Sequence, residues 1–278
     1  MNSIHIFQKN KGCYLDFSWY SVIDMKLITL NAWCGRAGSS VHDFFEKYKD
    51  IDIFCLQEVD LDGSKFDTDV TGSNPPAGDP FLFRSIQDIL PNHHGFFAPI
   101  LSSWWGNAIF IKNDIYRNMT AYGEVLISDE QQKYMPYDTW FRRSLQWLDF
   151  SIQDELYTLV NYHGLWEKDK GKGDSNDRIK QSQNIINFLS TKKDRKIILT
   201  GDFNLSPQTE SLQLFEDFGL ENLITRFAIT DTRTSLYEKE NRFADYTFVS
   251  KDITVNEFTV LPDEVSDHAP LYLEINEK

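Results

Sequence analysis

Short runs of apolar residues, many of them β-branched, recur along the chain and are separated by turn-forming residues. Runs of about four to eight such residues between turn signals are typical of β-strands. The pattern predicts strands at residues 26–30, 53–57, 108–111, 145–151, 157–162, 196–200, 245–249 and 271–275.

Helical periodicity occurs between some of these runs. Apolar residues in the segment 41–48 follow the i, i+3, i+4, i+7 spacing that places them on one face of a helix. Ser175 or Asp177 can cap the start of another helix. The predicted helices span residues 40–48, 80–90, 176–189 and 208–216.

The order of these elements predicts an α/β fold. Several neighbouring strands are joined by short turns, which indicates antiparallel pairs. The pattern therefore favours two mixed, mainly antiparallel sheets that pack face to face, with helices outside. Residues 25–278 are expected to form a single domain. Residues 1–24 are interpreted as an N-terminal arm or extension, and both a functional start at Met25 and a short extra hairpin stay open.

Composition places the chain among globular proteins. Hydrophobic residues make up 41% of the 278 residues, which is enough for a large core, and no run of about 18 apolar residues predicts a membrane span. The first 24 residues lack the apolar segment and cleavage site of a signal peptide. Cys13, Cys34 and Cys55 show no paired spacing, which argues against a disulfide framework or a zinc cluster. We therefore expect the cytoplasm or another reducing compartment.

The formal net charge of −14 bears on the partners. An acidic surface repels polyanions, so strong binding to duplex nucleic acid is not expected, although the same charge serves solubility. A small or flexible substrate and a monomeric protein are expected instead. Two basic clusters are exceptions to the acidic character, namely Lys168, Lys170 and Lys172, and Lys192, Lys193, Arg195 and Lys196.

Polar residues that can do chemistry stand at the ends of the predicted strands. Each one alone has an ordinary explanation, such as a turn residue, a solvent-facing carboxylate or a buried histidine with a hydrogen-bond partner. Their repetition at strand ends predicts that loops at one edge of the sheets build a site. The residues concerned are Asn31, Glu58, His163, Asp202, Asn204, Asp245, Asp267 and His268.

The segments that contain these residues resemble, in order and spacing, the motifs of the DNase I-like endonuclease/exonuclease/phosphatase superfamily. The resemblance covers residues 26–276 and is most specific in the combination of GDFN with SDHAP. It implies a four-layered α/β sandwich and a phosphoesterase that depends on Mg²⁺ or Mn²⁺. The segments are LITLNAW, IFCLQEVD, NYHGLW, ILTGDFNLSP, RFADYTFVS and EVSDHAPLYLEI.

The same resemblance implies roles for single residues. Glu58 matches the principal metal-binding glutamate, and Asn31 and Asp267 would complete the shell, directly or through water. Asp202 matches the residue that orients or deprotonates the attacking water. The remaining matches are Asn204, which would hold a phosphate oxygen or the nucleophile, His163 and His268, which would contact phosphate, and Asp245, which would support His268.

Three further residues have either a role in the site or an ordinary structural role. Arg143, at the start of a predicted strand, either adds a phosphate contact or is a surface arginine. Asn107 either supports the site or shapes a turn. Arg178 is expected to form ion pairs along its own helix.

The favoured function is metal-dependent hydrolysis of a phosphodiester or phosphomonoester by an activated water. A nuclease or nucleic-acid repair endonuclease is the alternative among enzymes. An inactive binding module is the alternative from another class, and the complete set of matched residues argues against it. The segment FADY around Asp245 departs from the WCDR-like segment of inositol-polyphosphate 5-phosphatases and disfavours that branch.

Overall fold

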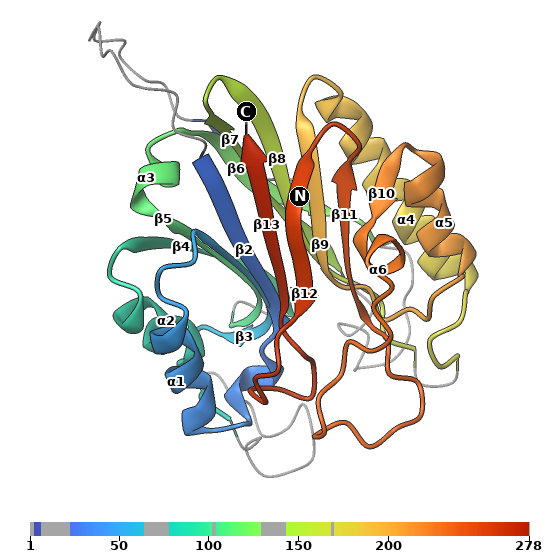
Figure 1. Cartoon of the computed structure of the whole chain (residues 1–278). Coiled ribbons are helices and arrows are strands. Elements are labelled where there is room, and N and C mark those ends of the chain that lie inside the picture. The colour runs from blue at the N-terminus through green and yellow to red at the C-terminus, as the bar shows by residue number, and fades with distance from the viewer. Residues whose placement is uncertain are drawn as a thin grey trace, which may run out of the picture.

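Two β-sheets pack face to face and carry helices on their outer faces in the computed structural model of the chain (Figure 1). The structure describes residues 3–6, 23–63, 78–101, 104–128, 143–167 and 170–277. The arrangement confirms the predicted sandwich of two mixed sheets between helical layers.

Within these residues one sheet has six strands and the other has seven. The six-stranded sheet has the order β12 (Thr254–Val260), β13 (Leu271–Glu277), β2 (Ile23–Asn31), β3 (Ile53–Asp60), β5 (Trp105–Lys112) and β4 (His93–Leu101). The seven-stranded sheet has the order β1 (Ser3–Ile6), β6 (Met119–Leu126), β7 (Ser144–Ile152), β8 (Glu155–His163), β9 (Lys196–Asp202), β11 (Asp245–Ser250) and β10 (Leu220–Asn222).

One parallel pair lies inside each sheet, β2 with β3 and β8 with β9, and the other strand pairs of the described residues are antiparallel. Parallel strands bring their carboxyl ends to the same edge. Asn31 therefore pairs with Gln57, and His163 pairs with Asp202. The antiparallel strand β11 brings its first residue, Asp245, opposite Asp202.

Amphipathic helices cover the outer faces of the sheets. Helices α1 (Ser39–Lys47) and α2 (Leu82–Ile89) pack their buried residues against the outer side of β2, β3 and β5. Helices α4 (Asn176–Leu189) and α5 (Glu210–Asp217) pack with the strands of the seven-stranded sheet. The shorter helices are η1 (Trp33–Gly35), α3 (Asn113–Tyr116), η4 (Ser190–Lys192) and α6 (Leu223–Arg226).

All eight predicted strands and all four predicted helices are present, with ends that differ by a few residues. Of the two capping candidates, Ser175 caps α4 and accepts a hydrogen bond from the Arg178 backbone N–H. The pattern missed β1, β4, β6, β10 and β12.

The structure describes only part of the predicted N-terminal arm, residues 1–24. Residues 3–6 form β1, which pairs with β6 at an edge of the seven-stranded sheet. Residues 7–22, with Cys13, lie outside the described residues, and so does Lys168. None of the helices in the described part of the chain is long and apolar enough to cross a membrane.

Candidate active site

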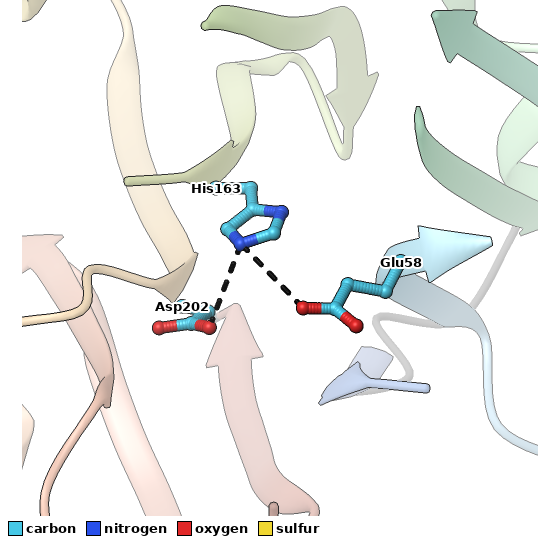
Figure 2. Close-up of side chains that lie close together, drawn as sticks. All are labelled: Glu58, His163 and Asp202. Carbon is cyan, nitrogen blue, oxygen red and sulfur yellow. Dashed lines mark ion pairs between the residues drawn. The ribbon is translucent and has the colours of Figure 1, made fainter. Parts of the chain in front are cut away.

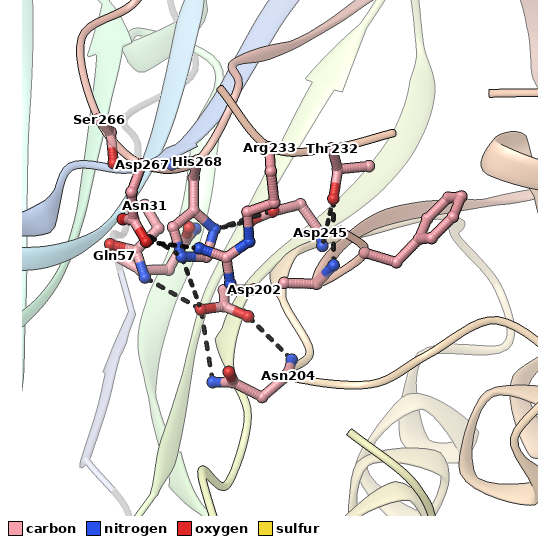
Figure 3. Close-up of polar contacts among 12 residues, drawn as sticks. Asn31, Gln57, Asp202, Asn204, Thr232, Arg233, Asp245, Ser266, Asp267 and His268 are labelled. Atoms are coloured by element: carbon pink, nitrogen blue, oxygen red, sulfur yellow. Dashed lines mark hydrogen bonds and ion pairs between the residues drawn. The ribbon is translucent and has the colours of Figure 1, made fainter. Parts of the chain in front are cut away.

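The eight residues that the sequence placed at strand ends come together at one end of the two sheets (Figure 2 and Figure 3). Asp202 lies at the centre of their contacts. Its Oδ2 accepts from Asn31 Nδ2 at 3.0 Å and lies 3.7 Å from His163 Nε2 and 3.6 Å from His268 Nε2. The site thus draws on both sheets, because Asn31 ends β2 and His163 ends β8.

Glu58 reaches this site through an irregularity in β3. The register between β3 and β5 shifts between Leu56 and Val59, and Glu58 has a φ of 53°. The Glu58 carboxylate accepts from Asn31 Nδ2 at 3.1 Å, and Asn31 Oδ1 accepts from the backbone N–H of Trp33 at 3.0 Å. Burial raises the pKa of Glu58, although the bond from Asn31 and the nearby His268 oppose that shift.

His268 is held by a carboxylate. Its Nδ1 lies 2.8 and 2.9 Å from the two oxygens of Asp245, and its backbone N–H donates to Ser266 Oγ. Burial is the largest influence and lowers the pKa of His268, but the charges of Asp245 and Asp202 and the hydrogen bond to Asp245 together leave the pKa above its usual value. The Nε2 atom faces Asp202, and the raised pKa favours the imidazolium form of the ring.

His163 differs from His268 in its charge. Its Nε2 lies 3.9 Å from Glu58 Oε1 and 3.7 Å from Asp202 Oδ2 (Figure 2). Burial, followed by the nearby Arg143 guanidinium, lowers the pKa of His163 to about 3. The ring is therefore neutral at pH 7, and these two contacts are not ion pairs at that pH.

Asp202 remains ionised. Burial raises its pKa, but His268, His163 and cationic side chains nearby together move the pKa well below the ordinary value. Asn204, with a φ of 55°, donates its backbone N–H to Asp202 Oδ1 at 2.8 Å. A carboxylate stabilised in this way is a weak base and is well suited to accept a hydrogen bond from a water molecule.

Asp267 is oriented by an arginine that the sequence pattern did not identify. Arg233 donates from Nη1 to Asp267 Oδ2 at 2.8 Å, its side chain is 4% exposed, and its guanidinium lies 4.1 Å from the centre of the Tyr237 ring. Arg233 lies in an irregular segment before β11, where no strand-end signal marks it. An isolated β-bridge between Arg233 and His268 ties this segment to the site.

The structure describes Arg143, Asn107 and Arg178, and all three are buried. Arg143 is buried and donates from Nε to the Gly164 carbonyl at 3.0 Å, so it is not a surface arginine. Asn107 is completely buried on β5, and neither of its amide atoms has a hydrogen-bond partner among the described residues. The expectation for Arg178 is wrong, because it is buried and binds the Leu165, Gly171 and Gly173 carbonyls and Glu167 instead of residues on its helix.

The donor set fits a hard divalent cation. Glu58, His163 and Asp202 each place one ligand atom within 4.8 Å of the others, as do Asp202, Asp245 and His268. Asp267 Oδ1 is buried and has no hydrogen-bond partner among the described residues. Carboxylate oxygens are ligands that Mg²⁺ prefers, so the group of Glu58, His163 and Asp202 offers two such residues and a histidine to an ion.

Comparison with known proteins agrees with this geometry. Residues 28–268 match the model of the Endonuclease/Exonuclease/phosphatase family, a range that contains each residue of the site described above. A comparison with curated proteins gives no match.

Solved structures share the fold. An endonuclease/exonuclease/phosphatase family protein from Bacteroides thetaiotaomicron is 17% identical, with a TM-score of 0.70 over 93% of this chain and 100% of that one. The mannosyl-6-phosphatase of Bacteroides thetaiotaomicron VPI-5482 is 19% identical, with a TM-score of 0.65 over 90% and 99%. A humanized D. rerio TDP2 is 14% identical, with a TM-score of 0.63 over 91% and 99%.

Proposed function

Because the chain belongs to the endonuclease/exonuclease/phosphatase family, we propose that it is a metal-dependent phosphoesterase. The observation that supports this most is the convergence of four carboxylates, two histidines and two asparagines at one end of both sheets. An inactive binding module would have no need of this complete set.

Glu58 and Asp267 would hold the metal, with Asn31 orienting Glu58. Arg233 binds Oδ2 of Asp267, whereas Oδ1 accepts no hydrogen bond among the described residues and lies 3.9 Å from His268 Nε2. When bound, Mg²⁺ or Mn²⁺ would neutralise charge that develops on the phosphoryl group. Four carboxylates in one site also repel one another, and a divalent cation relieves that repulsion.

The chain itself supplies the other parts of an in-line hydrolysis. Asp202 accepts a hydrogen bond from the attacking water, and Asn204 holds the Asp202 carboxylate in place. His268, as an imidazolium supported by Asp245, donates from Nε2 to a phosphoryl oxygen. His163 acts as a neutral donor, and Arg143 and Asn107 are the further candidates for contacts to the substrate.

The substrate is proposed to be a small or flexible phosphoester. A sugar phosphate is the first choice for an assay, because the mannosyl-6-phosphatase shares the fold. The fold is equally shared with TDP2, so nucleic-acid substrates belong in the same panel.

The test is turnover of this panel with Mg²⁺, with Mn²⁺ and with a chelator. We expect hydrolysis only with a divalent ion, and Asp202→Asn should lower kcat by about 10²–10⁴-fold while circular dichroism stays unchanged. Asp217→Asn, an exposed carboxylate at the end of α5, is the matched control and should keep full activity. Activity of Asp202→Asn close to that of the wild type would contradict the assigned role.

A further inference from the structure

A buried amide side chain joins the two sheets next to Glu58. Asn161 lies in β8 of the seven-stranded sheet and is completely buried. Its Nδ2 donates to the carbonyl oxygens of Leu56 and Ala108 in the other sheet, at 3.0 and 3.1 Å. Its Oδ1 accepts a hydrogen bond from Gln57 Nε2 at 2.7 Å. One side chain of β8 thus binds two carbonyl oxygens and one amide side chain of β3 and β5.

The two carbonyls that Asn161 binds border the β-bulge that carries Glu58. Leu56 pairs with Ala108, and the next pair is Val59 with Gly106. Gln57 and Glu58 therefore lie opposite a single residue of β5. A bulge of this kind interrupts the ladder and leaves backbone groups without strand partners. The amide of Asn161 supplies the partner for two carbonyl oxygens at this interruption.

The bulge decides where Glu58 points. Leu56 and Val59 both pack in the cluster under α1 and α2, although regular alternation would place residues three apart on opposite faces. The extra residue is Glu58, whose positive φ is unfavourable for a side chain other than glycine. With this extra residue, the Glu58 carboxylate reaches Asn31 and lies 3.9 Å from His163 of the opposite sheet. Without it, Glu58 would face the helices.

We propose that Asn161 is a positioning residue for the metal site. Its N–H groups hold the bulge in the conformation that aims Glu58, and Gln57 fixes the orientation of the Asn161 amide. The inference rests on the proposed role of Glu58 as a metal ligand. Groups that orient a ligand typically change metal affinity or activity by about 10–100-fold when they are removed.

The experiment compares Mn²⁺ binding by calorimetry on the full chain. Asn161→Leu keeps a similar volume but removes the donors to Leu56 and Ala108, and we expect its Kd for Mn²⁺ to rise by about 10–100-fold. Turnover should recover as the Mn²⁺ concentration rises, because the remaining ligands are intact. A merely structural role would lower stability without changing the metal dependence.

The matched control is Thr158→Val on the same strand. Thr158 is completely buried and loses one hydrogen bond, to Asp149 at 2.7 Å, but it has no bond to the bulge. We expect a lower Tm and an unchanged Mn²⁺ affinity. An Asn161→Leu protein that binds Mn²⁺ as tightly as the wild type would overturn the inference and leave the proposed function intact.

Two further results are decisive. If Asn161→Leu does not fold, Gln57→Leu replaces it, because that change removes the hydrogen bond to Asn161 Oδ1. Weaker Mn²⁺ binding by Gln57→Leu supports the inference, and unchanged binding overturns it. A wild-type protein that binds no Mn²⁺ would overturn the proposed function and this inference together.

Discussion

At the scale of single residues, the two histidines of the site do different work because their neighbours differ. His163 has a cationic neighbour, Arg143, which adds to the effect of burial and keeps the ring neutral. His268 has an anionic neighbour, Asp245, at hydrogen-bond distance, which raises the pKa of the ring and favours its cationic form. If a phosphate binds at this site, we therefore expect His268 rather than His163 to supply the positive charge.

Arg233 is the residue-scale feature with the clearest consequence for activity. Its bond to Asp267 Oδ2 orients the carboxylate, and its charge lies close enough to lower the pKa of Asp202. We expect Arg233→Met to lower kcat/KM by about 10–100-fold at saturating metal, the usual cost of removing a partner of a metal ligand. Steady-state kinetics on the best phosphoester of the panel measure this.

The control for that change is Arg226→Met. Arg226 also pairs with a carboxylate, Glu221 at 2.7 Å, but both side chains are more than a third exposed and take no part in the site. Equal kinetics for Arg233→Met, Arg226→Met and the wild type would show that Asp267 needs no orientation.

At the scale of elements, the strands that the sequence pattern predicted and those that it missed lie at different places in the sheets. The eight predicted strands all lie inside a sheet, whereas β1, β4, β10 and β12 lie at the four sheet edges, and β6 lies next to β1. Inner strands read as continuous apolar runs because both faces are covered. Edge strands carry polar residues, as in the sequence TVNEFTV of β12, so no apolar run marks them.

The same contrast explains how much of the site was predictable. Residues such as Asn31, Asp202 and Asp245 stand at the ends of inner strands, and a strand-end rule finds them. Arg233 lies in an irregular segment, and Asn161 lies inside an apolar strand, where it looks like an ordinary core position. Their contacts depend on how two sheets meet, which no local pattern records.

The substitution Gly201→Ala tests whether the site needs the close approach of β8 and β9 beside it. It has a φ of 139°, and a Cβ there would lie 2.0 Å from the Tyr162 carbonyl oxygen. Gly201→Ala must therefore push the strands apart just before His163 and Asp202. Adding the costs of overpacking and of backbone strain, about 1–3 kcal/mol each, we expect the free energy of unfolding to fall by about 2–6 kcal/mol. Urea denaturation measures this, and activity should fall as well.

Gly219→Ala serves as the comparison for this change. Gly219 has a φ of 111°, yet a Cβ there would meet nothing within 4 Å. It should lose about 1–3 kcal/mol from strain alone and keep full activity. Identical behaviour of the two variants would mean that the contact with Tyr162 does not constrain the site.

At the scale of the whole molecule, the placement of charge restricts the substrate. The basic cluster before β9 lies at the opposite end of that strand from Asp202, so about 20 Å of strand separates them. Three of its four cations also face carboxylates, since Lys192 and Arg195 lie 2.7 and 3.7 Å from Asp149, and Lys196 lies 3.4 Å from Glu155. We therefore expect this cluster not to bind a polyanion that occupies the site.

Two cationic side chains near the site already bind oxygen atoms of the protein. Lys172 donates to the Phe243 carbonyl at 2.6 Å, and burial, together with the nearby Arg233, lowers its pKa to about 8. Arg233 itself is paired with Asp267. Binding of duplex DNA requires several cations that neutralise phosphates along the backbone. We therefore expect the described residues around the site to serve one phosphate group rather than such a series.

We therefore expect a small phosphoester to be hydrolysed in preference to duplex nucleic acid. The measurement is competitive turnover of mannose 6-phosphate and bis-p-nitrophenyl phosphate against a duplex oligonucleotide, at about 0.15 M salt, where exposed charges beyond about 8 Å are screened. A net charge of −14 adds a general repulsion that weakens as salt rises, so any cleavage of the duplex should not decline steeply with salt. Faster cleavage of the duplex than of either small substrate, with a steep loss as salt increases, would instead identify a nuclease whose phosphate contacts come from residues outside the described part of the chain.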